Sequence, residues 1–110
     1  MSLFQSLFGT ATKKYTDVRA EEFLKLLEET PNAVLLDVRT PAEFASGKVK
    51  GATNIDIYSP SFGTAISKLD KNKTYFVYCR SGARSGQACN VMADQGFEKL
   101  YNLAGGIVSL

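Results

Sequence analysis

The stretch TYFVYCRSGARSGQACNVMADQGF, residues 74–97, decides the fold of this chain. It opens with YFVY at residues 75–78, a run of aromatic and β-branched residues that is typical of a buried strand. Cys79 follows, and a segment of small, polar and basic residues then leads into a pattern that predicts a helix over residues 85–95. The sequence therefore predicts a cysteine at the carboxyl end of a strand, in a tight loop that enters a helix.

The loop after Cys79 combines several features of an anion site. The N–H groups in the first turn of a helix lack intrahelical partners, and the helix dipole adds partial positive charge there. Arg80 and Arg84 contribute two side-chain charges. The same groups would stabilise a thiolate, so we expect the pKa of Cys79 to lie below the ~8.5 of a free cysteine. A buried, inert cysteine is the alternative, but the converging arginines and serines favour an activated nucleophile.

The spacing within the loop indicates its chemistry. Four residues separate Cys79 from Arg84, and Ser85 follows. The corresponding loop of protein tyrosine phosphatases is one residue longer, which makes room for a phosphoryl group. A loop as tight as this one fits a single outer sulfur atom on the cysteine better than a phosphate.

The overall composition limits the classes of function. With 110 residues, of which 45% are hydrophobic and 22% charged, the chain has the size and composition of one globular domain. A net charge of +2 is too small to indicate binding to nucleic acid. No apolar run is long enough to span a bilayer, so we expect no stable membrane insertion.

Cysteine and histidine usage limits the chemistry further. Two cysteines are too few for a disulfide-dense secreted scaffold, so we expect a reducing, cytoplasmic compartment. Cys89 falls on an apolar helical stripe, which predicts a core residue, with a resolving thiol as the alternative. The chain has no histidine, which excludes Ser–His and Cys–His pairs and histidine-ligated metals, and we expect no metal and no cofactor. Sulfur transfer from thiosulfate suits such a site, because sulfite leaves as a stable anion without a general acid.

Short apolar strands alternate with amphipathic helices along the rest of the chain. This alternation predicts an α/β domain with a parallel sheet, in which ligands bind at the carboxyl ends of the strands. Asp37, Cys79 and Gly105 all lie at such ends, and Asp17 is the predicted N-cap of the first helix. The expected strands cover residues 14–16, 33–38, 52–57, 75–78 and 99–103, and the expected helices cover residues 18–29, 64–69 and 85–95, with a short helix beginning near residue 41.

Charged residues that follow the second expected strand are candidates for supporting the cysteine loop. Asp37 could orient Arg84 or another donor of that loop, or it could cap its own loop. Thr40 and Glu43 form the pattern of a capping box at a helix start. Arg39 could pair with Glu43 four residues later, a pair that contributes little to stability if it is exposed.

The cysteine loop resembles the active-site loop of the rhodanese-like sulfurtransferases, whose pattern is Cys-Arg-x-Gly-x-Arg-Ser. The matching positions are Cys79, Arg80, Gly82, Arg84 and Ser85. Further parts of the resemblance are LDVR at residues 36–39 with EF at 43–44, the segment 47–54, and LAGG at 103–106. The resemblance implies a three-layer α/β fold with a five-stranded, mostly parallel sheet and helices on both faces.

The resemblance also implies a function and the residues that serve it. Sulfane sulfur would move from thiosulfate or a persulfide donor to a thiol or cyanide acceptor through a persulfide on Cys79. Asp37 and Arg39 would support the cysteine loop without contacting the substrate. The partners would be a small anionic sulfur donor and a thiol acceptor. The residues that cradle the sulfur and the incoming anion would be Arg80, Ser81, Gly82, Ala83, Arg84 and Ser85.

Other functions remain open at this point. The main alternative is a non-catalytic rhodanese-like module that binds a partner or senses sulfide. A small phosphatase or an arsenate reductase is a further alternative, which the four-residue spacing and the lack of a general acid disfavour.

The ends of the chain and one internal segment differ from the family pattern. Residues 1–13 are expected to form a tail or a short amphipathic segment before a domain at residues 14–110. GKVKG at residues 47–51 stands where the family has Gly-His-Ile-Pro-Gly, so the geometry of that loop is expected to differ. The family's tryptophan and final helix are missing before Leu110, and apolar surface exposed there would favour weak self-association.

Overall fold

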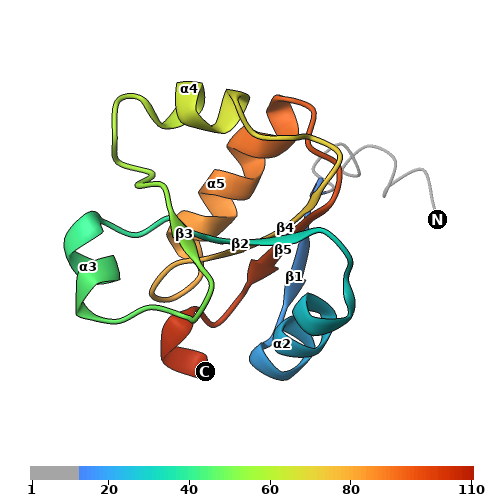
Figure 1. Ribbon diagram of the computed structural model, residues 1–110, viewed down its shortest axis with the longest axis vertical. Helices are drawn as coiled ribbons and strands as arrows, with labels where there is room; N and C mark the ends of the chain where they lie inside the picture. The colour runs from blue at the N-terminus through green and yellow to red at the C-terminus, as the bar shows by residue number, and fades with distance from the viewer. Residues whose placement is uncertain (1–12) are drawn as a thin grey trace, which may run out of the picture.

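Five parallel strands form the centre of the molecule in the order β1-β5-β4-β2-β3 (Figure 1). The computed structural model describes residues 13–110, so the predictions for residues 1–12 lie outside the described part. The strands are β1 (Thr16–Val18), β2 (Ala33–Asp37), β3 (Thr53–Asn54), β4 (Thr74–Tyr78) and β5 (Leu100–Leu103). The helices are α2 (Ala20–Glu29), α3 (Pro41–Ser46), α4 (Phe62–Ser67) and α5 (Ala83–Asp94), with a short 3-10 helix η2 (Ile107–Ser109).

The predicted three-layer α/β fold is confirmed, and all strand pairs of the sheet are parallel. Strand β4 lies in the middle, paired with β2 through Leu36 and Val77 and with β5 through Tyr75 and Leu100. A central strand of a parallel sheet is buried on both faces, which explains why β4 is an almost continuous apolar run. This strand carries Cys79 at its carboxyl end.

Alternate residues of β4 serve two separate hydrophobic cores. Tyr75 and Val77 point to one face, where α4 and α5 pack against the sheet. Phe76 and Tyr78 point to the other face, where they contact α2. Phe76 is fully buried between an edge-on contact with Phe23 and a stacked contact with Tyr101. The period of two in the strand therefore divides the molecule into its layers.

Several element boundaries differ from the expected ones, each for a local reason. Asp17 is not a helix N-cap, because parallel pairing with β5 extends β1 to Val18 and Arg19 becomes the N-cap of α2 without a side-chain cap. Strand β3 is shorter than expected, although the N–H groups of Ile55 and Ile57 still donate to carbonyls at the end of β2. The C-terminal end of α5 agrees with the prediction, since Gly96 follows the C-cap with a positive φ of 101°.

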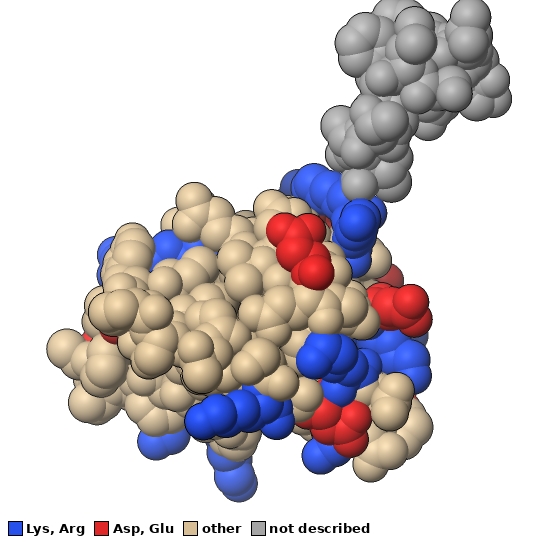
Figure 2. Space-filling model, turned by 90° about the horizontal axis from the view of Figure 1, so that it is seen from above, with Lys and Arg blue, Asp and Glu red and all other residues tan. Residues whose placement is uncertain are grey.

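Charged side chains are dispersed on the face shown in Figure 2, where Lys and Arg form separate groups with Asp and Glu among some of them. This distribution agrees with the small net charge of +2. Within residues 13–110, none of the helices has both the length and the apolar character needed to cross a membrane.

Replacing Phe76 with alanine should lower the free energy of unfolding by about 3 to 5 kcal/mol, because a fully buried ring is lost from the smaller core. Chemical denaturation followed by circular dichroism measures this loss. The matched control is Leu24→Ala on α2, where the side chain is 44% exposed and the change should be below about 1 kcal/mol. Equal losses in the two variants would contradict the assignment of Phe76 to the core.

Candidate active site

Cys79 lies directly after β4, at the bottom of the loop that leads into α5. The residue is 1% exposed, so its thiol is enclosed by the loop. The Gly82 N–H donates to Cys79 Sγ at 3.1 Å, and the Ser85 hydroxyl donates to the same sulfur at 3.4 Å. Two of the predicted loop residues, Gly82 and Ser85, thus contact the sulfur atom directly.

Three backbone carbonyls of the loop are engaged by hydrogen-bond donors. Ile107 N–H donates to the Cys79 carbonyl at 2.9 Å, and Val108 N–H donates to the Arg80 carbonyl at 3.3 Å. The third is the Gly82 carbonyl, which accepts hydrogen bonds from Gly86 N–H at 3.1 Å and from Asn102 Nδ2 at 3.3 Å. In a planar trans peptide the N–H points opposite to the preceding carbonyl. Anchoring the Arg80 carbonyl therefore sets the direction of the Ser81 N–H, and the N–H groups of Ser81, Gly82 and Ser85 together face the sulfur, as in an anion-binding nest.

Two glycines allow the loop to approach the turn after β5 backbone to backbone. Gly82 has a positive φ of 105°, and a Cβ there would lie 2.1 Å from the Ala104 carbonyl oxygen. Gly106 has a φ of 69°, and a Cβ there would lie 2.0 Å from the Arg80 carbonyl oxygen. No side chain fits at either position, so both glycines are required for the close approach. The double-glycine turn is therefore part of the wall of the site.

The pKa of the Cys79 thiol results from two opposing effects. Burial raises this pKa, because it disfavours the charged thiolate. Hydrogen bonds from the Ser85 hydroxyl and from the N–H groups of Ser85, Gly82 and Ser81 lower it, and together they outweigh burial. The pKa of Cys79 is thus lowered, which favours the nucleophilic thiolate over the thiol.

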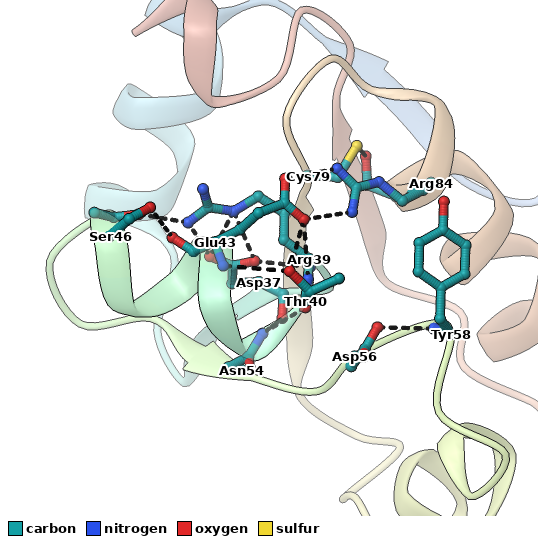
Figure 3. Close-up of polar contacts among 12 residues, drawn as sticks. Asp37, Arg39, Thr40, Glu43, Ser46, Asn54, Asp56, Tyr58, Cys79 and Arg84 are labelled. Atoms are coloured by element: carbon teal, nitrogen blue, oxygen red, sulfur yellow. Dashed lines mark hydrogen bonds and ion pairs between the residues drawn. The ribbon is translucent and has the colours of Figure 1, made fainter.

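Arg84 and Glu43 form an ion pair at the edge of the site (Figure 3). Arg84 Nη1 lies 2.7 Å from Glu43 Oε1, and Nη2 lies 3.0 Å from Oε2, a two-pronged contact. The expected pair of Arg39 with Glu43 is therefore wrong, and so is the orientation of Arg84 by Asp37. Both expectations relied on closeness in sequence or on a shared sheet edge, whereas the fold places α3 against the start of α5.

Glu43 has a second role as part of the predicted capping box, which is confirmed. Thr40 Oγ1 accepts from Glu43 N–H at 3.2 Å, and Glu43 Oε1 accepts from Thr40 N–H at 3.1 Å. The hydrogen bond from Arg84 is the largest cause that lowers the pKa of Glu43 to about 2, and the bonds from Thr40 act in the same direction. The carboxylate consequently links the start of α3 to the cysteine loop.

Asp37 and Arg39 form a buried ion pair of their own. Arg39 N–H donates to Asp37 Oδ1 at 2.9 Å, which confirms that Asp37 caps its own loop. Arg39 Nη2 donates to Asp37 Oδ2 and to the Gly47 carbonyl, each at 2.6 Å, and its guanidinium lies 5.6 Å from the centre of the Tyr78 ring. This pair fixes the segment between α3 and β3 and supports the site only at a distance.

The remaining predicted residues differ in exposure. Arg80, Ser81 and Ala83 are exposed on the rim of the loop. The side chain of Arg80 forms no hydrogen bond or ion pair with any residue between 13 and 110. Cys89 is fully buried in the core, and burial raises its pKa to about 12, which is unsuited to a resolving thiol. Arg80 thus carries the accessible positive charge of the loop, because the charge of Arg84 is engaged by Glu43.

Three residues of the site were not assigned to it from the sequence. Glu43 was assigned to the helix cap and to a pair with Arg39, Tyr58 follows the third expected strand, and Asn102 lies in the last one. Tyr58 is 67% exposed, and its ring lies 5.6 Å from the Arg84 guanidinium. The one available signal was the pattern EF at residues 43–44, which belongs to the resemblance but does not reveal a contact across the fold.

Comparisons with known proteins extend these observations. The family model for the rhodanese-like domain matches residues 19–110. The chain is 36% identical over 93 residues to a sulfurtransferase of Allochromatium vinosum, covering 84% of this chain and 85% of that protein. It is 38% identical over 72 residues to the thiosulfate sulfurtransferase PspE of Escherichia coli, covering 66% of this chain and 68% of that protein. The crystal structure of a rhodanese-related protein from Thermoplasma volcanium is similar with a TM-score of 0.72 at 27% identity, covering 84% of this chain and 87% of that one.

Replacing Glu43 with glutamine should remove the ion pair while keeping the capping box, since glutamine also serves in that motif. We expect a loss of stability on the order of 1 kcal/mol at pH 7. Because the pKa of Glu43 falls from 4.5 to about 2 on folding, its contribution is complete above about pH 4.5 and is lost as the pH falls towards 2. Urea denaturation of both proteins across this range measures the difference in unfolding free energy.

The control for this experiment is Glu28→Gln, which removes an exposed carboxylate of α2. No ion pair of Glu28 occurs within the described part of the chain, so its stability difference from the wild type should be small throughout. A Glu43→Gln difference that stayed constant between pH 7 and pH 2 would contradict the role of the Arg84 ion pair.

Proposed function

This chain belongs to the rhodanese-like domain family, and we propose that it is a sulfurtransferase that acts through a persulfide on Cys79. The sulfur donor is thiosulfate or a persulfide, and the acceptor is a thiol, with cyanide as a laboratory substitute. The observation that carries this proposal is the pair of hydrogen bonds from Gly82 N–H and the Ser85 hydroxyl to Cys79 Sγ. Two of the relatives named above are themselves sulfurtransferases by name.

The first step transfers sulfur to the protein. The Cys79 thiolate attacks the outer sulfur of thiosulfate, a new S–S bond forms, and the S–S bond of thiosulfate breaks. Sulfite leaves with the bonding electron pair, and the negative charge of the persulfide lies on its outer sulfur. Inward N–H groups of the loop stabilise such a charge without rearrangement, in the manner of an oxyanion hole.

The second step regenerates the thiolate. An acceptor thiolate attacks the outer sulfur of the persulfide, and Cys79 leaves as a thiolate with the electron pair of the S–S bond. The lowered pKa of Cys79 makes it a better leaving group, so the same hydrogen bonds favour both steps. Neither step requires a proton from a general acid, in agreement with a chain that has no histidine.

Phosphoryl transfer is less well supported by this site. Both terminal nitrogens of the Arg84 guanidinium bind Glu43, so this arginine does not offer a free two-pronged contact to a phosphate. A purely binding module would not need a cysteine with a lowered pKa at the centre of the loop. We therefore retain sulfur transfer as the proposed function.

Incubation with thiosulfate should add one sulfur atom to the purified protein, as intact mass spectrometry would detect. Cyanide should remove this sulfur and release thiocyanate. The Cys79→Ser variant should not gain sulfur, because its nucleophile is missing. The Cys89→Ser variant serves as the control and should still gain sulfur, since Cys89 is buried away from the loop. If neither thiosulfate nor a persulfide donor loads the folded wild-type protein, the proposal is wrong.

Replacing Arg80 with glutamine should raise the KM for thiosulfate about five-fold, with a smaller change in kcat. The reason is that the positive charge of Arg80, which attracts the dianionic donor in the wild type, is removed. The KM of the wild type should also rise with ionic strength more steeply than that of the variant. Steady-state kinetics with cyanide as the acceptor measures both effects.

The matched control is Lys25→Gln, which removes the same charge from the exposed surface of α2. Its KM for thiosulfate should match that of the wild type. An equal increase in both variants would mean that the overall charge, and not the position of Arg80 on the loop, determines donor binding.

A further inference from the structure

Asn102 is a polar side chain of β5 that is buried behind the cysteine loop, with only 3% exposed. Its Nδ2 donates to Asp17 Oδ1 at 2.9 Å and to the Gly82 carbonyl at 3.3 Å. Among residues 13–110, Asn102 Oδ1 is buried without a hydrogen-bond partner. The side chain therefore connects the edge strand β1, through Asp17, to the loop that holds Cys79.

The orientation of the Asn102 amide follows from its partners. An ionised carboxylate and a backbone carbonyl only accept hydrogen bonds, so the nitrogen must face both Asp17 and Gly82. The unpartnered Oδ1 is unfavourable, because a buried acceptor without a donor loses its hydration. A buried group left unsatisfied in this way calls for an explanation. Here the amide is held with Nδ2 towards two acceptors, Asp17 Oδ1 and the Gly82 carbonyl, at the expense of Oδ1.

The Gly82 carbonyl and Cys79 Sγ compete for a single proton. Ser85 Oγ lies 3.4 Å from the sulfur and 3.2 Å from the Gly82 carbonyl oxygen, but a hydroxyl has only one hydrogen to donate. The Gly82 carbonyl also accepts from Gly86 N–H at 3.1 Å. With a second donor from Asn102, this carbonyl has two partners without the serine, which matches its two lone pairs.

We propose that Asn102 is a positioning residue for Cys79: by donating to the Gly82 carbonyl, it leaves the Ser85 hydroxyl free to donate to the sulfur. The same contact anchors the peptide between Gly82 and Ala83, so that the Ala83 N–H points away from Asn102. This inference rests on the proposed role of Cys79 as the nucleophile. Its test measures thiol reactivity directly and does not need sulfur transfer.

Other charged and titratable groups surround this connection and must be considered in the test. Arg84 on α5 and Arg80 on the loop are the cations near Cys79. Asp17, Tyr15 and Cys89 lie on the side of Asn102, and Lys13 pairs with Asp17. These residues stay unchanged in the substitutions at position 102.

The first test is Asn102→Leu, which keeps a similar volume but removes the donor. The measurement is the second-order rate of alkylation of Cys79 by iodoacetamide, followed by mass spectrometry. Its dependence on pH between about 5 and 10, the range in which thiols ionise, reports the thiol pKa. We expect this pKa to rise by about 0.7 units, the equivalent of one ordinary hydrogen bond, and the rate at low pH to fall about five-fold. An unchanged pKa in the folded variant would overturn the proposal.

The route through the serine is tested by combining substitutions. In a Ser85→Ala background the shared proton is absent, so Asn102→Leu should produce little further shift in the thiol pKa. A full additional shift would overturn the proposed connection through Ser85. The matched control is Asn54→Ala, because Asn54 Nδ2 also donates to two backbone carbonyls, those of Asp37 and Arg39. This variant should lose stability without a shift in the thiol pKa.

A substitution at Asp17 keeps the test informative if the variants at position 102 do not fold. Asp17 has a partly exposed side chain, and Asp17→Leu keeps a similar volume while removing the acceptor that orients Asn102. Loss of a negative charge alone would lower the thiol pKa. The proposal instead expects the thiol pKa to rise as the Asn102 amide loses its orientation, and a decrease would count against it.

Discussion

The close approach of two backbone segments controls the site: the cysteine loop lies directly against the turn that follows β5. A Cβ at Gly82 or at Gly106 would collide with a carbonyl of the facing segment. Without side chains between the segments, the N–H groups of Ile107 and Val108 reach the carbonyls of Cys79 and Arg80. The anchored Arg80 carbonyl sets the direction of the Ser81 N–H, which is one of the donors that lower the pKa of Cys79.

This arrangement separates the tasks of stabilising charge at the sulfur and attracting an anionic donor. Backbone and hydroxyl groups act on the buried Cys79 sulfur, where each hydrogen bond is strong because water is excluded. Arg84 is engaged by Glu43 and links α5 to α3, so its charge is largely balanced. Arg80 remains exposed on the rim. A reactive thiolate can thus be kept in a buried position without a buried, unbalanced cation beside it.

Strong local patterns made most of the fold predictable. The apolar run of β4 and the amphipathic pattern of α5 depend on neighbours in the sequence, and the predicted positions agree with the structure within a few residues. The capping box at Thr40 and Glu43 was predictable for the same reason. Asp17 was misassigned because aspartate is common both at helix starts and elsewhere, and only pairing with β5 showed that β1 continues past it. Local preference is overridden wherever the sheet supplies partners.

The sequence alone determined the order of strands and helices along the chain, the position of Cys79 at a strand end, and the loop that surrounds it. These features follow from periodicity and from residues that are adjacent in the chain. Only the tertiary structure decided which polar side chains meet: Glu43 reaches Arg84 across 41 positions, and Asn102 reaches Gly82 across 20. The physical reason is that a pattern shows which face a residue occupies, whereas the partner on that face depends on how separate elements pack together.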